Sequence, residues 1–207
     1  MADNVLKYGL RYVKGHFNLD AAIQRMRVVS GYSPTVGGNN VNVTPGDVVK
    51  KVSDGTVALC AAGDQPYGVV QRIHPYYDTN LGRMTIGTKL PFNTVYGSNL
   101  ERQSFVSIIP VQNAIFEAVA DDKTTATTKA TYTGYIGENV DLINTGDTTR
   151  GTVNPMIDIS VHATTNTLTW RIVDIAPQIN IDFTGLYVPL YIAANYSQDA
   201  PFTILGV

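Results

Sequence analysis

The segment PGDVVKKVSDGTVALCAAGDQPYGVVQRI, residues 45–73, decides the fold class of this chain. It contains three short runs rich in valine, a residue that fits the half-buried surface of a pleated sheet. Asp54-Gly55 separates the first two runs and can supply the positive φ angles of a tight primed hairpin turn. A Gly-Asp-Gln-Pro turn at 63–66 separates the second run from the third. The segment therefore predicts a self-contained β-meander.

Short strands and turn residues continue to alternate along the rest of the chain. We expect an all-β fold built from short-stranded meander, small barrel or sandwich modules, with an extended N-terminal arm and a C-terminal tail. The expected division is an arm at 1–31, a first β module at 32–93, a second at 94–183, and a C-terminal strand and tail at 184–207. Strands of the second module are predicted by QSFVSIIPVQ (103–112), NAIFEAVADD (113–122), YTGYIGENVDLIN (132–144), NPMIDISV (154–161) and TLTWRIVDIAP (167–177).

The stretch NLDAAIQRMRVVSG, residues 18–31, admits two readings. It could be a helix capped by Asn18, with a stripe of apolar residues at helical spacing. It could also be a coil that leads into the strand RMRVVSGY, because Val28 and Val29 favour the pleat and Gly31 would end it. We favour the strand.

Composition and charge argue against a membrane protein, a secreted protein and a nucleic-acid-binding protein. Apolar residues make up 44% of the 207 residues, yet Gly, Pro, Asn and Asp interrupt them too often for a membrane span of ~20 residues. The N-terminus lacks the apolar core of a secretory signal. We therefore expect a soluble globular protein that is made in the cytoplasm and does not bind membranes. A pI near 5.8 argues against nucleic acid as a partner.

The net charge of -2 conceals an uneven distribution. Residues 1–30 carry five bases against two acids, so the arm is basic and the remaining chain is acidic. A basic arm could bind the acidic surface of a partner, although it could equally be an ordinary solvated face. The candidate partner-binding residues are Lys7, Arg11, Lys14, Arg25 and Arg27.

The sequence contains no convincing set of metal ligands, catalytic carboxylates or reactive thiols. His16, His74 and His162 lie far apart in sequence, and none has a second metal ligand at a typical spacing. Glu117 and Asp141 could be imagined as a carboxylate pair, but both are read more simply as strand residues with an outward charge. The sole cysteine, Cys60, is expected to be a small buried hydrophobe, and Trp170 a core residue. We predict no enzyme activity, no metal and no cofactor.

Several motifs together resemble the capsid decoration, or cement, proteins of tailed bacteriophages. In the first half these are VVSGYSPT (28–35) and GDVVKKVSDGTVALCAAGDQPYGVVQRIHPYYDTNLGRM (46–84). The second half agrees in outline through FEAVADD, NVDL, GTVNPMIDIS, TLTWRIVDIAP and the terminal FTILGV. The resemblance covers most of the chain, but its motifs mark turns and strands and include no catalytic residue.

The resemblance implies a structural virion protein that binds the outer surface of an assembled capsid and stabilises neighbouring coat subunits. Its partners would be the lattice of the major capsid protein and neighbouring copies of itself, and its location the capsid surface. An alternative is another virion binding module, such as a tail-fibre or receptor-binding β domain. A carbohydrate-active enzyme is a third possibility, disfavoured because neither Glu117 nor Asp141 has a neighbour that would raise its pKa.

Overall fold

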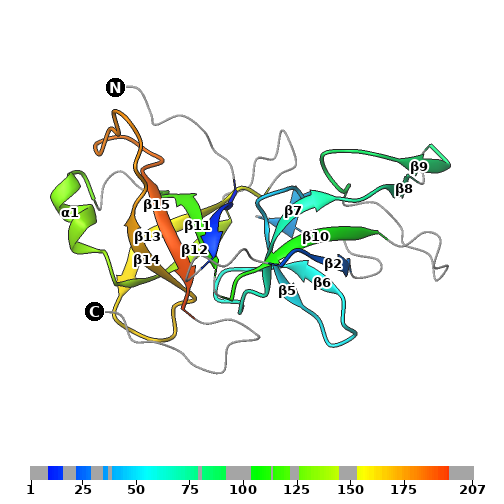
Figure 1. The fold of residues 1–207 in the computed structure, drawn as a ribbon, viewed down its shortest axis with the longest axis horizontal. Helices are drawn as coiled ribbons and strands as arrows, with labels where there is room; N and C mark the ends of the chain where they lie inside the picture. The colour runs from blue at the N-terminus through cyan, green and yellow to red at the C-terminus, as the bar shows by residue number, and fades with distance from the viewer. Residues whose placement is uncertain are drawn as a thin grey trace.

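The computed structural model shows an all-β protein in which two curled antiparallel sheets lie at opposite ends of the long axis (Figure 1). The predicted all-β class is confirmed. The structure describes residues 9–15, 22–28, 35–36, 39–78, 81–91, 104–112, 114–121, 126–144 and 153–195.

The six-stranded sheet follows the order β1-β11-β15-β14-β12-β13. A parallel bridge between Ala120 and Ile157 joins the end of β11 to β13, so the sheet curls around its core without closing into a barrel. Its strands are β1 (Arg11–Gly15), β11 (Ala114–Val119), β12 (Asn139–Asn144), β13 (Pro155–Ala163), β14 (Trp170–Ile175) and β15 (Pro189–Ala194).

The five-stranded sheet follows the order β2-β10-β7-β5-β6, and a parallel bridge between Val28 and Val57 joins its two edges. Two short hairpins complete the described strands. The elements are β2 (Gln24–Arg27), β5 (Val48–Lys51), β6 (Val57–Leu59), β7 (Gly68–Ile73) and β10 (Phe105–Pro110), with the hairpins β3 (Thr35–Val36) and β4 (Asn39–Asn40), and β8 (Tyr76–Asp78) and β9 (Arg83–Thr85).

The valine-rich segment forms three strands as predicted, but they are not in the order of a meander. β7 returns to pair with β5, where Val48 lies opposite Val69, and β6 occupies the other side of β5. The connection 60–67 makes this possible because both of its ends bond to β5: Cys60 N donates to Val48 O, and Tyr67 N donates to Val49 O. The segment is not self-contained either, since β10 and β2 extend the sheet beyond β7.

The turn between β5 and β6 also differs from the expected primed type. Gly55 has a φ of 79°, whereas Asp54 does not adopt a positive φ. Gly55 N donates to Val52 O, as in a type I turn followed by a left-handed glycine. The Asp54 carboxylate accepts hydrogen bonds from the backbone N and the hydroxyl of Thr56, which fixes this longer turn.

The N-terminal segment expected to be an arm contributes an edge strand to each sheet. β1 pairs with β11, and β2 pairs with β10. The strand reading of residues 18–31 is confirmed for Gln24–Arg27. β10 lies within the expected second module in sequence yet belongs to the five-stranded sheet, so the two sheets cross the expected module boundaries.

Residues 129–134 form a helix whose last three residues overlap the start of the strand predicted at 132–144. α1 (Lys129–Gly134) is capped by Thr128, whose hydroxyl accepts a hydrogen bond from Thr131 N. Tyr132 is fully buried, and its ring lies 5.8 Å from that of Phe183. The N-cap and this burial outweigh the β preference of the threonines. Within the described segments, no helix has the length and apolar character needed to cross a membrane.

The larger hydrophobic core belongs to both sheets. Phe116 and Trp170, both buried, meet edge to face with ring centroids 6.0 Å apart, so the prediction of a core tryptophan is confirmed. Val48, Val69 and Ile109 of the five-stranded sheet pack into the same cluster. The two sheets are therefore joined by shared apolar burial, while a smaller core fills the five-stranded sheet.

Two glycines allow the backbones of the two sheets to touch. Leu10 N, just before β1, donates to Gly46 O at 2.8 Å. A Cβ on Gly9 would lie 2.4 Å from that carbonyl oxygen, and Gly46 itself has a φ of 93°. Any larger side chain at Gly9 would thus separate the two sheets.

A buried carboxyl group lies beside this crossing. Asp47 is fully buried, and its Oδ2 accepts hydrogen bonds from the backbone N and the hydroxyl of Thr44. Its Oδ1 has no hydrogen-bond partner. Burial raises the pKa of Asp47 to about 7, and the two Thr44 bonds offset only part of that rise.

We predict that Asp47 makes the stability of the fold depend on pH. Its carboxyl ionises near pH 4 in the unfolded chain but near pH 7 in the native one, so rising pH between these values favours the unfolded chain. The stability of Asp47→Asn minus that of the wild type should increase by a few kcal/mol between pH 4 and pH 8. Urea unfolding of both proteins at each pH measures this difference in the free energy of unfolding. A stability difference between Asp47→Asn and the wild type that stays constant with pH would contradict the prediction.

We also predict that Arg11 stabilises the fold through Glu117. The Arg11 side chain is 61% exposed, whereas the Glu117 side chain, 2.6 Å away, is only 3% exposed. Arg11→Ala should reduce the free energy of unfolding by about 1–3 kcal/mol, because a buried carboxylate loses a charged hydrogen bond. In a double-mutant cycle, Arg11→Ala should cost much less in a Glu117→Gln background. Equal costs in both backgrounds would show that the pair is not coupled.

Candidate interaction surfaces

The structure separates the predicted basic residues into two groups. Lys7 lies outside the described residues. Arg11 and Lys14 are on β1 of the six-stranded sheet, where Arg11 is paired with Glu117 and Lys14 is exposed. Arg25 and Arg27 are on β2 of the five-stranded sheet. The four described residues therefore do not form one basic arm.

Arg25 lies near two further basic residues, which come from β7 and from the position just after it. Arg25 lies opposite Ser107 on β10, and Ser107 lies opposite Arg72 on β7. Residues directly opposite one another in adjacent strands point to the same face, so both arginines lie on the outer face of the sheet. His74, just after β7, has its Nε2 2.8 Å from the hydroxyl of Ser107. We call Arg25, Arg72 and His74 the basic row.

A β-bulge puts Arg72 on this face. Simple alternation along β7 would place Arg72 on the same side as the buried Val70. The register shifts between Ser107 and Ile108, however, so that β7 has an extra residue at Gln71. Ile73 then joins Val70 in the smaller core, and Arg72 turns outward. No pattern in a single sequence shows where such a bulge occurs.

An aromatic ring holds one end of the basic row. The guanidinium carbon of Arg25 lies 4.2 Å from the centroid of the half-buried Phe105 ring, at cation–π distance. Arg27 lies opposite Phe105 and extends the row along β2. Arg27 also approaches Asp54, whose pKa is lowered mainly by hydrogen bonds from Thr56 and to a smaller extent by Arg27.

The charges of the row act on one another. The pKa of His74 is lowered, first by desolvation and then by the positive charges of Arg25 and Arg72. In the part of the chain that the structure describes, neither Arg25 nor Arg72 has an ion pair with a carboxylate. The row is thus a positively charged surface whose charges are available to an acidic partner.

The carboxylates considered for catalysis are not brought together. β15 and β14 lie between β11, which carries Glu117, and β12, which carries Asp141. Glu117 is buried against Arg11 and Gln178, so the expectation of an outward charge there is wrong. Asp141 accepts hydrogen bonds from the backbone N and hydroxyl of Thr169. Each carboxylate thus stabilises its own part of the fold.

The other reactive residue types also have structural surroundings. Cys60 is partly buried against the larger core, and this burial raises the pKa of its thiol. His162 Nδ1 lies 2.5 Å from Glu138 Oε2, and its ring lies against Tyr135. His16 lies outside the described residues. No group of three or more His, Cys, Asp or Glu side chains that could hold a metal ion occurs among those that are described.

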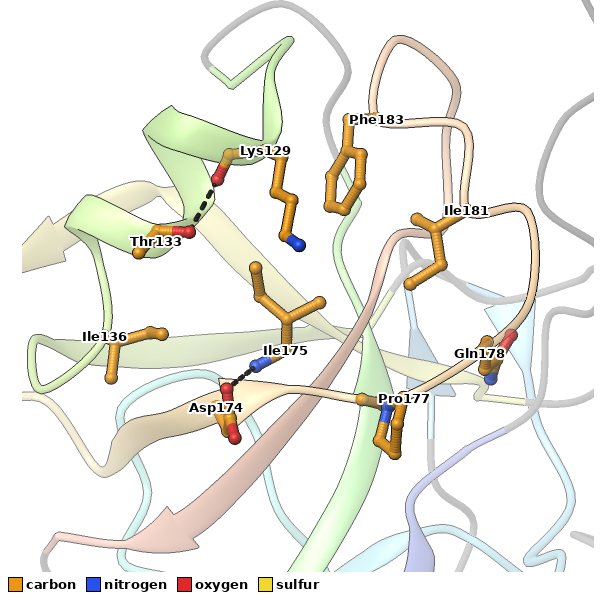
Figure 2. Close-up of a pocket in the computed structure, with 10 residues that line it drawn as sticks. Lys129, Thr133, Ile136, Asp174, Ile175, Pro177, Gln178, Ile181 and Phe183 are labelled. Atoms are coloured by element: carbon orange, nitrogen blue, oxygen red, sulfur yellow. Dashed lines mark hydrogen bonds between the residues drawn. The ribbon is translucent and has the colours of Figure 1, made fainter.

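A groove of about 410 Å³ lies between α1 and the loop that follows β14 (Figure 2). Ile136, Ile175, Ile181 and Phe183 line it, and the Lys129 side chain extends into it from the helix. The Asp174 carboxylate lies at its edge, where Oδ1 accepts a hydrogen bond from Ile175 N. The groove is therefore apolar, with one charge of each sign beside it.

None of the three comparisons with known proteins, by family model, curated sequence or solved structure, finds a match.

We predict that the pKa of His74 depends on the positive charges of Arg25 and Arg72. Replacing Arg72 or Arg25 with Ala removes a nearby positive charge, so the pKa of His74 should rise in either variant. NMR titration of the His74 ring measures the shift. Lys14→Ala, which removes an exposed base from the other sheet, should leave this pKa unchanged. A His74 pKa that does not respond to either arginine would show that the three side chains do not share one surface.

Proposed function

We propose that this protein decorates the outer surface of an assembled phage capsid and stabilises neighbouring coat subunits. The observation that carries the proposal is the basic row on the outer face of the five-stranded sheet, whose arginines have no carboxylate partner among the described residues. Such a surface suits contact with an acidic protein surface. The resemblance of the turn and strand motifs to cement proteins supports the same conclusion.

The two ends of the molecule differ in charge in a way that fits this role. The described residues of the five-stranded end and its hairpins, 22–91 and 104–112, include seven Lys and Arg against four acids. Those of the six-stranded end include four bases against seven acids. A chain with such a charge distribution approaches an acidic lattice with one preferred end. The proposed function is contact, and we propose no catalysed reaction.

Binding of this kind stabilises a shell by mass action. A chain that binds the assembled lattice better than free subunits raises the cost of disassembly by about 2.7 kcal/mol per site at a hundredfold excess over Kd. Each contact can be weak, because many copies on a lattice act together.

The test measures binding of the purified chain to capsids that lack it, by co-sedimentation, and the melting temperature of those capsids. We expect the chain to bind assembled shells more tightly than free coat subunits and to raise their melting temperature. Arg25→Glu combined with Arg72→Glu should weaken binding at least about tenfold, because two attractive charges become repulsive. Added salt should weaken wild-type binding, since screening acts over ~10 Å at 0.1 M.

Lys14→Glu is the matched control, since it reverses an exposed base on the six-stranded sheet. It should bind much as the wild type does. If the charge reversals in the basic row have no larger effect than this control, the row is not the capsid contact. If particles without the chain melt at the same temperature but fail to adsorb to cells, the tail-fibre or receptor-binding alternative is favoured and the cement role is wrong.

A further inference from the structure

A projecting hairpin concentrates exposed apolar side chains. Leu81, Met84 and Ile86 are 56%, 52% and 81% exposed, and all three lie on or beside the β8–β9 hairpin. In Figure 1 this hairpin extends from the five-stranded end, away from the body of the molecule. Apolar side chains that cluster on a surface are a sign of an interaction site. We call these three residues the knob.

The hairpin is anchored where it leaves the body. Tyr76, at its base, is only 5% exposed and belongs to the smaller core. Tyr76 pairs with Thr85 and Asp78 with Arg83, and Leu81 N donates to the Asp78 carboxylate at the tip. Met84 is therefore held by strand pairing and Leu81 by its hydrogen bond to Asp78, which lowers the entropy cost of binding.

The groove between α1 and the loop after β14 has matching properties. It is lined mainly by apolar side chains, and its volume lies in the range of ~300–1000 Å³ typical of ligand sites. Lys129 and Asp174 lie beside the groove, while Asp78 and Arg83 lie beside the knob. The exposed Arg83 beside the knob can therefore meet the Asp174 carboxylate at the edge of the groove.

We propose that the groove receives the knob of a second copy of this chain. The knob and the groove belong to opposite ends of the molecule (Figure 1). Among the described residues, the end with the knob has an excess of bases and the end with the groove has an excess of acids. The contact is therefore head to tail. Repeated contacts of this type produce a closed ring or an open filament rather than a two-fold dimer.

The contact between two free chains is weak. Three side chains in one groove bury much less than the ~800 Å² per partner of a standard stable interface. Association in solution therefore needs high protein concentration. It requires no capsid, so it is tested separately from the proposed function.

The experiment measures self-association of the purified full chain by sedimentation velocity and small-angle scattering, from about 10 µM to about 1 mM. The wild type should form larger species as concentration rises. Met84→Asp combined with Ile86→Asp removes the knob, and Ile181→Asp removes the groove. Each change should weaken association at least about tenfold. Asp174→Lys, at an exposed position, is a second groove variant for the case that Ile181→Asp does not fold.

Mixing the variants distinguishes a head-to-tail contact from other arrangements. A knob variant keeps its groove and a groove variant keeps its knob, so an equimolar mixture should give one-to-one dimers that grow no further. Val161→Asp, on β13, is the matched control because its side chain is 41% exposed and lies in neither surface; it should associate as the wild type does. The proposal is overturned if the wild type stays monomeric throughout the range, if the knob variant associates normally, or if the mixture forms no dimer.

Discussion

The contact between the backbones at Gly9 and Gly46 is the constraint on which the architecture depends. The five-stranded sheet has a smaller core of its own, but the larger core is completed by residues of both sheets. The sheets must therefore approach closely, and the hydrogen bond from Leu10 N to Gly46 O requires two residues without side chains. Gly46 N in turn donates to Val70 O, so the crossing is tied to the middle of β7.

The buried Asp47 continues this constraint. Its carboxylate holds the Thr44–Asp47 turn in place through Thr44, while its backbone carbonyl accepts a hydrogen bond from Val70 N. A buried carboxyl that lacks a partner on one oxygen reduces stability as pH rises, yet it fixes the turn from which Gly46 reaches Leu10. Asp47 therefore lowers the stability of the fold at higher pH but fixes the position of the turn that joins the two sheets. β7, bonded at this junction, then positions both Val70 in the core and Arg72 on the surface.

The sequence predicts the strands better than their arrangement. Valine-rich runs and turn residues located β5, β6 and β7 because these signals are local. The pairing of β7 with β5 could not be predicted, since it depends on a connection long enough to cross to the other edge of β5. α1 was missed because Tyr132 is buried by a distant residue, Phe183. Local propensity contains no information about such tertiary contacts.

The candidate surfaces, too, depend on tertiary contacts that the sequence does not predict. The basic residues Arg25 and Arg27 could be selected from charge alone, but Arg72 becomes their neighbour only through the order of strands and the bulge at Gln71. Arg11 has the same charge and yet serves the fold, because its strand lies beside the buried Glu117. A cation on a strand is therefore available to a partner only where its neighbours leave its charge uncompensated. Arg25 and Arg72 meet that condition on the outer face of the five-stranded sheet. Whether a cation is available to a partner is thus decided by the arrangement of the strands and not by the residue alone.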